Sequence, residues 1–126
     1  MSDLRVSLVQ AATVWHDAEA NRGLYGDAVR ALRGQSELIV LPETFTSGFS
    51  NAAVGEAETM SGESVAWLRS LAADVGATVT GSVVVREGGA VYNRLLWARP
   101  DGSLSHYDKR HLFRMAGEHQ RYAGGT

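Results

Sequence analysis

The sequence contains no cysteine among its 126 residues. This absence excludes disulfide bonds, thiolate metal sites and a cysteine nucleophile within these residues. Proline is also scarce, with 2 residues, whereas glycine is common, with 14. No apolar stretch approaches the roughly 18 residues that span a bilayer, so we expect no membrane partner.

An excess of charge of one sign is lacking too. The sequence has 12 Lys and Arg residues and 14 Asp and Glu residues, and the formal net charge is −2. Because there is no basic run, we expect no nucleic-acid partner. Residues 1–5 lack the basic-then-apolar layout of a signal peptide, which predicts a cytoplasmic location. The composition, with 44% apolar and 21% charged residues, is typical of one globular domain.

Hydrophobic periodicity predicts an alternation of strands and helices. One helix begins after Asp17, its expected N-cap, and ends before Gly34; a second carries an apolar stripe over 65–75 and stops at Gly76. Gly88-Gly89 predicts a hairpin turn. Strands are expected at 4–10, 37–41, 78–85, 90–98 and 104–107.

Residues 42–61 show little periodicity and are predicted to form a long loop, of a length that is usually functional. The order is then β-α-β-loop-α-β-β-β, without internal repeats, which favours an α/β sheet. The chain stops in Gly124-Gly125-Thr126 rather than at a closing element. We therefore expect an incomplete domain.

Glu43 directly follows the apolar run that ends in Leu41-Pro42. Ligands collect at the carboxyl ends of strands in open α/β sheets, so a carboxylate at this position is well placed for acid–base chemistry. Position alone fits a solvated loop glutamate better. Phe45 and Phe49 favour the catalytic interpretation, because we expect them to shield Glu43 from water and tune it for proton transfer.

Lys109 follows the strand at 104–107 in the same way, and an ammonium there would stabilise an oxyanion. A basic residue in a solvated turn is the commoner case. Glu118, nine residues further on, either holds Lys109 in place or is simply exposed.

A metal-dependent hydrolase is an alternative, because histidines and carboxylates gather near the end of the chain. Their spacing does not match the i, i+4 pair of a helical zinc site, and no thiolate partner is present, so we expect no metal. No G-x-G-x-x-G or G-x-S-x-G pattern is present, and no cofactor is expected. The residues in question are His106, Asp108, His111, Glu118 and His119.

Four segments in order resemble the nitrilase, or carbon–nitrogen hydrolase, superfamily. The stretch Thr44-Phe45-Thr46-Ser47-Gly48-Phe49 is similar to its omega-amidase-like branch in particular. The resemblance covers essentially the whole chain, and several ordered motifs make it specific. The four segments are 6–10, 39–45, 92–94 and 107–113.

The resemblance implies the N-terminal half of an α-β-β-α sandwich, with residues 1–126 as the N-terminal part of one hydrolase domain. It also implies a Glu-Lys-Cys triad. Glu43 matches the general base and Lys109 the oxyanion-stabilising lysine, while Glu118 matches a supporting glutamate more loosely. The triad's cysteine would lie beyond Thr126. We expect Phe45, Phe49 and Phe113 to contact the substrate.

Two functions of different classes follow. The first is an amidase that releases ammonia from a small carboxylate-bearing amide through a cysteine acyl-enzyme. The second is a non-catalytic fragment or pseudo-enzyme that binds a partner or self-associates. The resemblance also implies a homodimer or higher homo-oligomer. If the sheet lacks its cover, we expect the apolar runs 38–41 and 83–85 to be exposed or covered by another copy of the chain. We also expect the isolated chain to be poorly stable or to self-associate, and to be inactive on amides.

Overall fold

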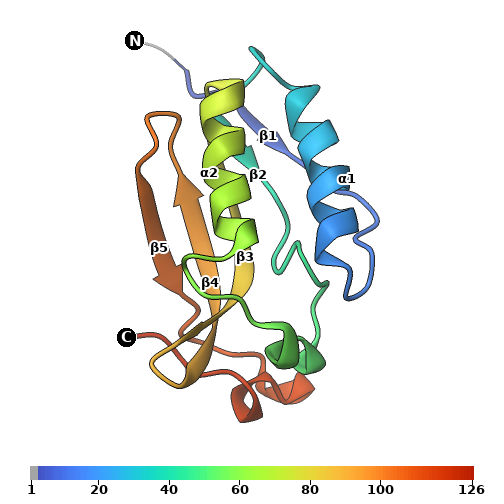
Figure 1. Cartoon of the computed structure of the whole chain (residues 1–126), viewed down its shortest axis with the longest axis vertical. Helices are drawn as coiled ribbons and strands as arrows, with labels where there is room; N and C mark the ends of the chain where they lie inside the picture. The colour runs from blue at the N-terminus through green and yellow to red at the C-terminus, as the bar shows by residue number, and fades with distance from the viewer. Residues whose placement is uncertain (1–2) are drawn as a thin grey trace.

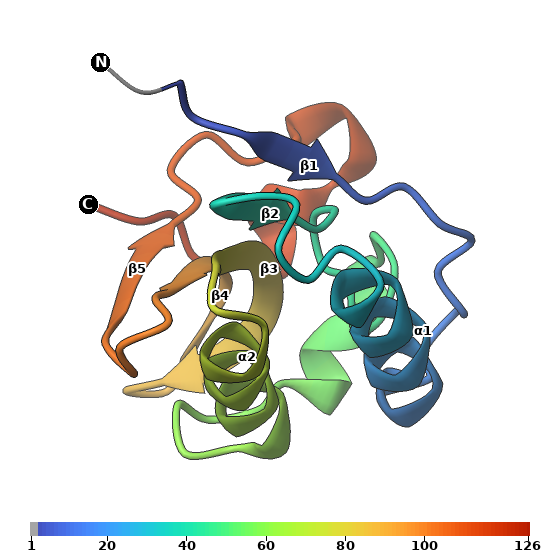
Figure 2. The same ribbon diagram turned by 90° about the horizontal axis from the view of Figure 1, so that it is seen from above.

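Five strands form one mixed sheet with two α-helices against one of its faces (Figures 1 and 2). The computed structural model describes residues 3–126. The spatial order is β1 (Val6–Leu8), β2 (Leu38–Val40), β3 (Thr78–Glu87), β4 (Ala90–Ala98) and β5 (Leu104–Asp108). The first three strands are parallel, and β4 and β5 are antiparallel to their neighbours. The expected order of elements and the α/β class are confirmed.

Both helices begin or end at the residues that the sequence indicates. The helix α1 (Ala18–Arg30) has Asp17 as its N-cap, whose carboxylate accepts a hydrogen bond from the Ala20 amide at 3.0 Å. The helix α2 (Glu63–Val75) ends at Gly76, which adopts a left-handed conformation with φ of 67°. Positive φ angles at Gly88 and Gly89 close the β3–β4 hairpin.

The predicted loop at 42–61 is more ordered than its sequence suggests. It contains the 3₁₀ helix η1 (Asn51–Glu56), and Glu58 forms a bridge with Val85 of β3. Two further 3₁₀ turns, η2 (Arg114–Ala116) and η3 (Glu118–Gln120), lie beside η1 at the lower end of the sheet (Figure 1). Within residues 3–126, no helix is both long and apolar enough to cross a membrane.

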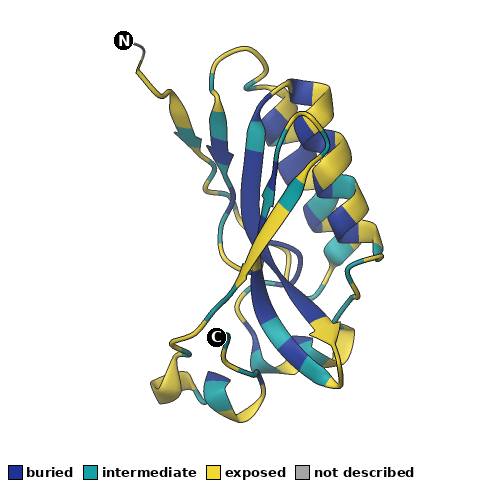
Figure 3. Ribbon diagram, turned by 90° about the vertical axis from the view of Figure 1, so that its left-hand side faces the viewer, coloured by how far each residue is buried: buried dark blue, intermediate teal, exposed yellow. Residues whose placement is uncertain are grey.

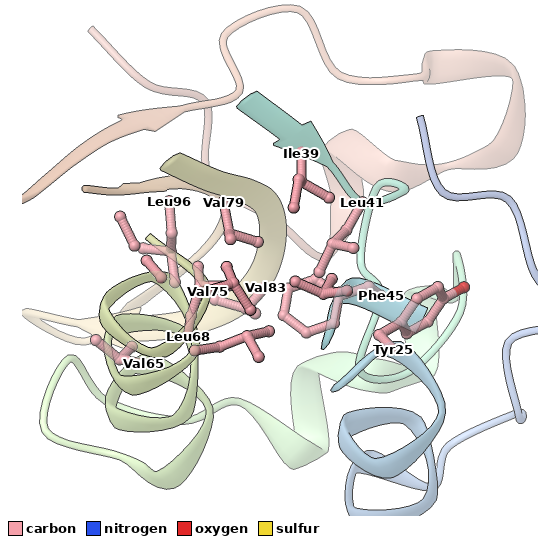
Figure 4. Close-up of a cluster of buried hydrophobic side chains, with 14 of the residues drawn as sticks. Tyr25, Ile39, Leu41, Phe45, Val65, Leu68, Val75, Val79, Val83 and Leu96 are labelled. Atoms are coloured by element: carbon pink, nitrogen blue, oxygen red, sulfur yellow. The ribbon is translucent and has the colours of Figure 1, made fainter. Parts of the chain in front are cut away.

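The main core lies between the sheet and the two helices, and Figure 4 shows it. Ile39, Val83 and Val85 are fully buried there. The expectation that the runs 38–41 and 83–85 would be exposed is therefore wrong. Side chains alternate between the two faces of a strand, so half of each run points under the helices. Val84, on the opposite face, is buried in a smaller cluster with Val91.

The opposite face of the sheet carries apolar side chains that neither helix covers. Figure 2 shows both helices on the same side, and Figure 3 shows exposed residues along the edge strands β1 and β5. Leu8 of β1 is 77% exposed, and Leu95 and Tyr107 are exposed as well. Exposed strand edges and apolar faces promote association. Self-association of this chain stays a prediction.

Gly81 is expected to be a sensitive position in the sheet. A Cβ atom there would lie 2.8 Å from Phe45 Cδ1 and 2.9 Å from Leu41 Cβ. We expect Gly81→Ala to lower the free energy of unfolding by about 1–3 kcal/mol, because the packed core cannot admit a methyl group. Gly23→Ala is the matched control: nothing lies within 4 Å of its Cβ position, inside α1. Alanine should stabilise that helix by roughly 0.5–1 kcal/mol. Urea unfolding of both variants measures the contrast, and equal effects would contradict it.

Candidate active site

The chain turns sharply after β2, and this turn brings Glu43 to the uncovered face of the sheet. The Leu41 amide donates to the Thr80 carbonyl at 2.7 Å and so continues the pairing of β2 with β3. Thr44 then adopts a left-handed φ of 48°, which is unusual for a β-branched residue. Its amide donates to Ser82 Oγ at 2.7 Å, which holds the turn in place.

Lys109 reaches the same face through the pairing of β4 with β5. Arg94 lies opposite Asp108 in the register, and the Lys109 amide donates to the Asn93 carbonyl at 2.9 Å. Because successive side chains alternate, Asp108 pairs with Arg94 on one face, while Asn93 and Lys109 point to the other. Lys109 Nζ lies 2.7 Å from Glu43 Oε2. The expected proximity of Glu43 and Lys109 is confirmed, whereas their catalytic roles stay predictions.

Glu118 is completely buried and joins the same cluster. Its Oε1 accepts a hydrogen bond from the Phe113 amide at 2.7 Å and lies 3.1 Å from Lys109 Nζ. The left-handed Gly117, with φ of 76°, turns the chain so that Glu118 at the start of η3 points inward. Of the two interpretations of Glu118, the one in which it holds Lys109 agrees with this geometry.

The charges of the cluster keep Lys109 protonated. Burial alone would lower the pKa of the Lys109 ammonium, but the hydrogen bonds to Glu43 and Glu118 offset it, and the pKa lies above the ordinary value. A lysine of raised pKa donates hydrogen bonds at neutral pH and does not accept protons. The chemical arrangement is therefore one fixed cation between two carboxylates, with the carboxylates as the groups able to act as a base.

Tyr122 anchors the segment that carries Glu118. Its hydroxyl donates to the Ser50 carbonyl at 2.8 Å, and nearby Asn51 Nδ2 donates to the Ala116 carbonyl at 2.6 Å. These contacts fasten residues 113–122 to residues 50–51. Burial, with smaller contributions from the charges of Glu118 and Glu43, raises the pKa of Tyr122 to about 12. The phenol is thus a donor in this site at neutral pH.

We expect the fold to lose stability as the pH rises above about 10. The unfolded chain releases the Tyr122 proton near the ordinary phenol pKa of 10.0, whereas the folded chain keeps it up to about 12. Between these values the unfolded state binds fewer protons, so the free energy of unfolding falls with pH. The raised pKa of Lys109 acts in the same direction.

Urea unfolding at about pH 9 and about pH 11 measures this loss, with Tyr122→Phe as the comparison. The variant should lose roughly 1 kcal/mol at the lower pH, because the hydrogen bond to Ser50 is gone. Between the two pH values, the free energy of unfolding of the variant should fall less steeply than that of the unsubstituted chain. If the free energy of unfolding falls equally with pH in both proteins, Tyr122 does not cause the loss of stability at alkaline pH.

The three phenylalanines expected at the substrate pocket have different positions. Phe45 is fully buried in the main core, with its ring 6.0 Å from that of Tyr25 and 5.6 Å from that of Trp67 (Figure 4). The expectation that Phe45 shields Glu43 is wrong, because the turn at Thr44 sends it under the helices. Glu43 keeps 44% of its side chain exposed.

Phe49 lies beside the lysine instead, and Phe113 packs against Phe49. Lys109 Nζ is 5.3 Å from the centroid of the Phe49 ring, and the rings of Phe49 and Phe113 are 6.3 Å apart. A cation over an aromatic face is stabilised by the ring quadrupole. The Phe49 ring thus restrains Lys109, and a direct contact with substrate stays a prediction for both phenylalanines.

A pocket of about 280 Å³ opens on the uncovered face next to the charged cluster. Its walls combine the charged groups with apolar side chains, a composition typical of small-molecule sites. The lining residues are Leu41, Glu43, Ser82, Asn93, Leu95, Tyr107 and Lys109.

The structure does not assemble the residues of the metal alternative. Asp108 is engaged by Arg94 at 2.6 Å, and Glu118 by Lys109. Across residues 3–126, no group of three or more His, Cys, Asp or Glu side chains is placed to hold a metal ion.

Sequence reasoning missed Asn93 and Ser82, which both contact the loop that carries Glu43. Asn93 Nδ2 donates to Glu43 Oε2 at 2.6 Å. The signal was present in the period-two alternation of the strands at 78–85 and 90–98, which places Ser82 and Asn93 on the same face of the sheet, although Ser82 pairs with Leu95 and Asn93 with Val84.

Comparisons with known proteins identify the family of the chain. The carbon–nitrogen hydrolase family model matches residues 5–125. The chain belongs to the carbon–nitrogen hydrolase family. The omega-amidase YafV of Yersinia enterocolitica is 43% identical over 127 residues, and that of Escherichia coli K12 is 38% identical over 126 residues.

Solved carbon–nitrogen hydrolases share the fold. XC1258 from Xanthomonas campestris, a superfamily member with an arsenic adduct in its active site, superimposes with a TM-score of 0.97 at 60% identity. Nit3 of Saccharomyces cerevisiae, from branch 10 of the nitrilase superfamily, gives a TM-score of 0.84 at 27% identity. The chain is matched over 98–100% of its length by these two structures but covers only 48–49% of theirs. It likewise spans about half the length of the curated relatives it matches, with 48% of each YafV protein covered.

Proposed function

We propose that these residues form the base and oxyanion side of an amidase site that hydrolyses a small carboxylate-bearing amide. The observation that carries the proposal is the convergence of Glu43, Lys109 and Glu118 beside a pocket at the end of β2 and β5. The similarity to the omega-amidases of two enterobacteria supports the reaction class. The nucleophile in this proposal is a cysteine outside the 126 residues, since none lies within them.

In the first step Glu43 takes the thiol proton as the sulfur attacks the amide carbon. A carbon–sulfur bond forms and the carbonyl oxygen becomes an oxyanion, which the ammonium of Lys109 stabilises. The raised pKa of Lys109 suits it to this role, because it stays charged throughout. Glu118 keeps Lys109 within reach at 3.1 Å.

In the second step the carbon–nitrogen bond breaks. Protonated Glu43 gives its proton to the departing nitrogen, and ammonia leaves behind a thioester. Water then attacks the thioester while Glu43 takes the water proton. The carbon–sulfur bond breaks, Glu43 returns this proton to the departing thiolate, and the carboxylic acid is released. One carboxylate thus serves as base and then as acid in each half of the reaction.

The test is to determine the coding sequence past Thr126 and to express the complete reading frame. We expect a cysteine at a strand-to-helix elbow, ammonia release from a small dicarboxylic acid monoamide, and an acyl adduct on that cysteine in the intact mass. A reading frame without such a cysteine would overturn the proposal. The homo-oligomer and the cytoplasmic location also remain predictions, which size-exclusion chromatography with light scattering and cell fractionation test.

A non-catalytic protein that binds a partner or its own copy is the second candidate. The exposed apolar face of the sheet, with Leu8, Leu95 and Tyr107, favours it. If the reading frame ends at Thr126, this candidate replaces the amidase. The purified 126-residue chain should then show specific, saturable self-association and no amide hydrolysis.

A further inference from the structure

Asn93 occupies a distinctive position among the residues around the pocket. It lies in the middle of β4, is 2% exposed, and points to the uncovered face where Glu43 and Glu118 meet. Its Nδ2 donates to Glu43 Oε2 at 2.6 Å and makes a longer contact of 3.4 Å with Glu118 Oε2. Since both neighbours are acceptors, the amide must present its NH₂ group to them.

The backbone of Asn93 contacts Lys109, the second residue proposed to act in catalysis. Its carbonyl accepts a hydrogen bond from the Lys109 amide at 2.9 Å, just after β5 ends. One residue therefore bonds to Glu43 through its side chain and to Lys109 through its main chain. Arg94, on the opposite face, locks the same stretch of β4 to Asp108.

The two donors around Glu43 use the same carboxylate oxygen. Lys109 Nζ and Asn93 Nδ2 both bind Oε2, at 2.7 and 2.6 Å. Among residues 3–126, no hydrogen bond to Glu43 Oε1 is found, and the side chain is partly exposed in the pocket wall. A carboxylate held by one oxygen is oriented and keeps the other oxygen available for a proton.

We propose that Asn93 is a positioning residue that, together with Lys109, holds Oε2 of Glu43 so that Oε1 is the oxygen that exchanges protons. This inference rests on the proposed amidase function for its catalytic meaning, but its structural part does not. A neutral amide suits the position because it favours the ionised carboxylate without titrating. The charged groups that face Glu43 are Lys109 and Glu118, and Tyr122 faces it as a neutral phenol.

The test uses Asn93→Leu, which keeps the branched shape but removes the donor, and Asn93→Asp, which replaces the donor with an acceptor. In the complete enzyme we expect Asn93→Leu to lower kcat by about 10–100-fold with KM within about 2-fold, because a misplaced general base loses part of its rate contribution. The acid limb of the kcat/KM profile should move to higher pH in Asn93→Leu and further in Asn93→Asp. Carboxylates that lose a donor, or gain a like charge, bind protons more readily.

Thr80→Val is the matched control for a purely structural effect. Thr80 is also buried in the sheet, its hydroxyl donates to the Leu96 carbonyl at 2.6 Å, and it does not line the pocket. We expect this variant to lose stability without any movement of the acid limb. If Asn93→Leu behaves in the same way, Asn93 is a structural residue and the proposal is overturned.

A second measurement separates this proposal from the proposed function. The ¹³C carboxyl resonance of Glu43, titrated by NMR in the complete protein, should have its midpoint at higher pH in Asn93→Leu than in Thr80→Val. If the midpoint shifts but the complete protein has no amidase activity, the proposed function is refuted and the positioning of Glu43 by Asn93 is supported. An unshifted midpoint in an active enzyme would refute the positioning role alone.

Discussion

Glu43→Gln in the complete enzyme is expected to lower kcat by about 10²–10⁴-fold. Glutamine has nearly the same shape but cannot take the thiol proton or return it to the departing nitrogen. In the proposed mechanism Glu43 acts in every proton transfer, so kcat and kcat/KM should fall together and KM should change little. Steady-state ammonia release, combined with a single-turnover measurement of the acyl adduct, tests this.

The control for Glu43 is Glu19→Gln, at an exposed position in the first turn of α1. It removes the same charge far from the pocket and should leave turnover unchanged. Circular dichroism of both variants confirms that the fold is retained. If Glu43→Gln keeps its full turnover, Glu43 is not the general base, and the proposed roles of Lys109 and Glu118 lose their main support.

Asp108→Ala is expected to lower the free energy of unfolding by about 3–5 kcal/mol. Arg94 is 1% exposed, and Asp108 binds it through both oxygens, at 2.6 and 2.9 Å. The carboxylates of Asp108 and Glu87 keep the pKa of the guanidinium above its ordinary range. That ordinary range is itself so high that the guanidinium stays charged when a partner is lost. The free-energy cost of leaving a buried guanidinium without its bidentate partner is larger than the net stabilisation that the intact pair provides. Urea unfolding measures the loss, which is a large share of a typical domain's stability.

Glu87→Gln is the matched control, because Glu87 binds the same guanidinium from the exposed side, at 3.1 Å. The hydrogen bond to Arg94 lowers the pKa of Glu87, but solvent screens an exposed pair, and we expect a small change in stability. The Arg94–Asp108 pair also sets the β4–β5 register that places Lys109 at the pocket. Equal losses in Asp108→Ala and Glu87→Gln would show that burial of the pair does not decide its contribution.

Local signals predicted the elements of this fold well where one residue type determines the conformation. Asp17 caps α1, Gly76 ends α2, and Gly88-Gly89 closes the hairpin, each as expected. The loop at 42–61 was harder to predict. Its 3₁₀ helix and the bridge from Glu58 to Val85 depend on partners far along the chain, which periodicity cannot report.

The aromatic residues near Glu43 show the same limit at the site. Phe45 and Phe49 both follow Glu43 closely in sequence, and both were expected to shield it. Only the positive φ of Thr44 and the space beside Gly81 decide that Phe45 turns under the helices. Phe49 instead lies against Lys109, which is 60 residues away in sequence, 109 against 49.

The order of strands and helices, the lack of a cysteine within these residues and the family resemblance of the motifs could all be read from residue types and short-range spacing. The meeting of Glu43, Asn93, Lys109 and Glu118 on one face could not, and neither could the binding of two donors to a single oxygen of Glu43. That convergence depends on strand register and on which face each residue occupies, and a slip of one residue would send each side chain of the slipped strand to the other face.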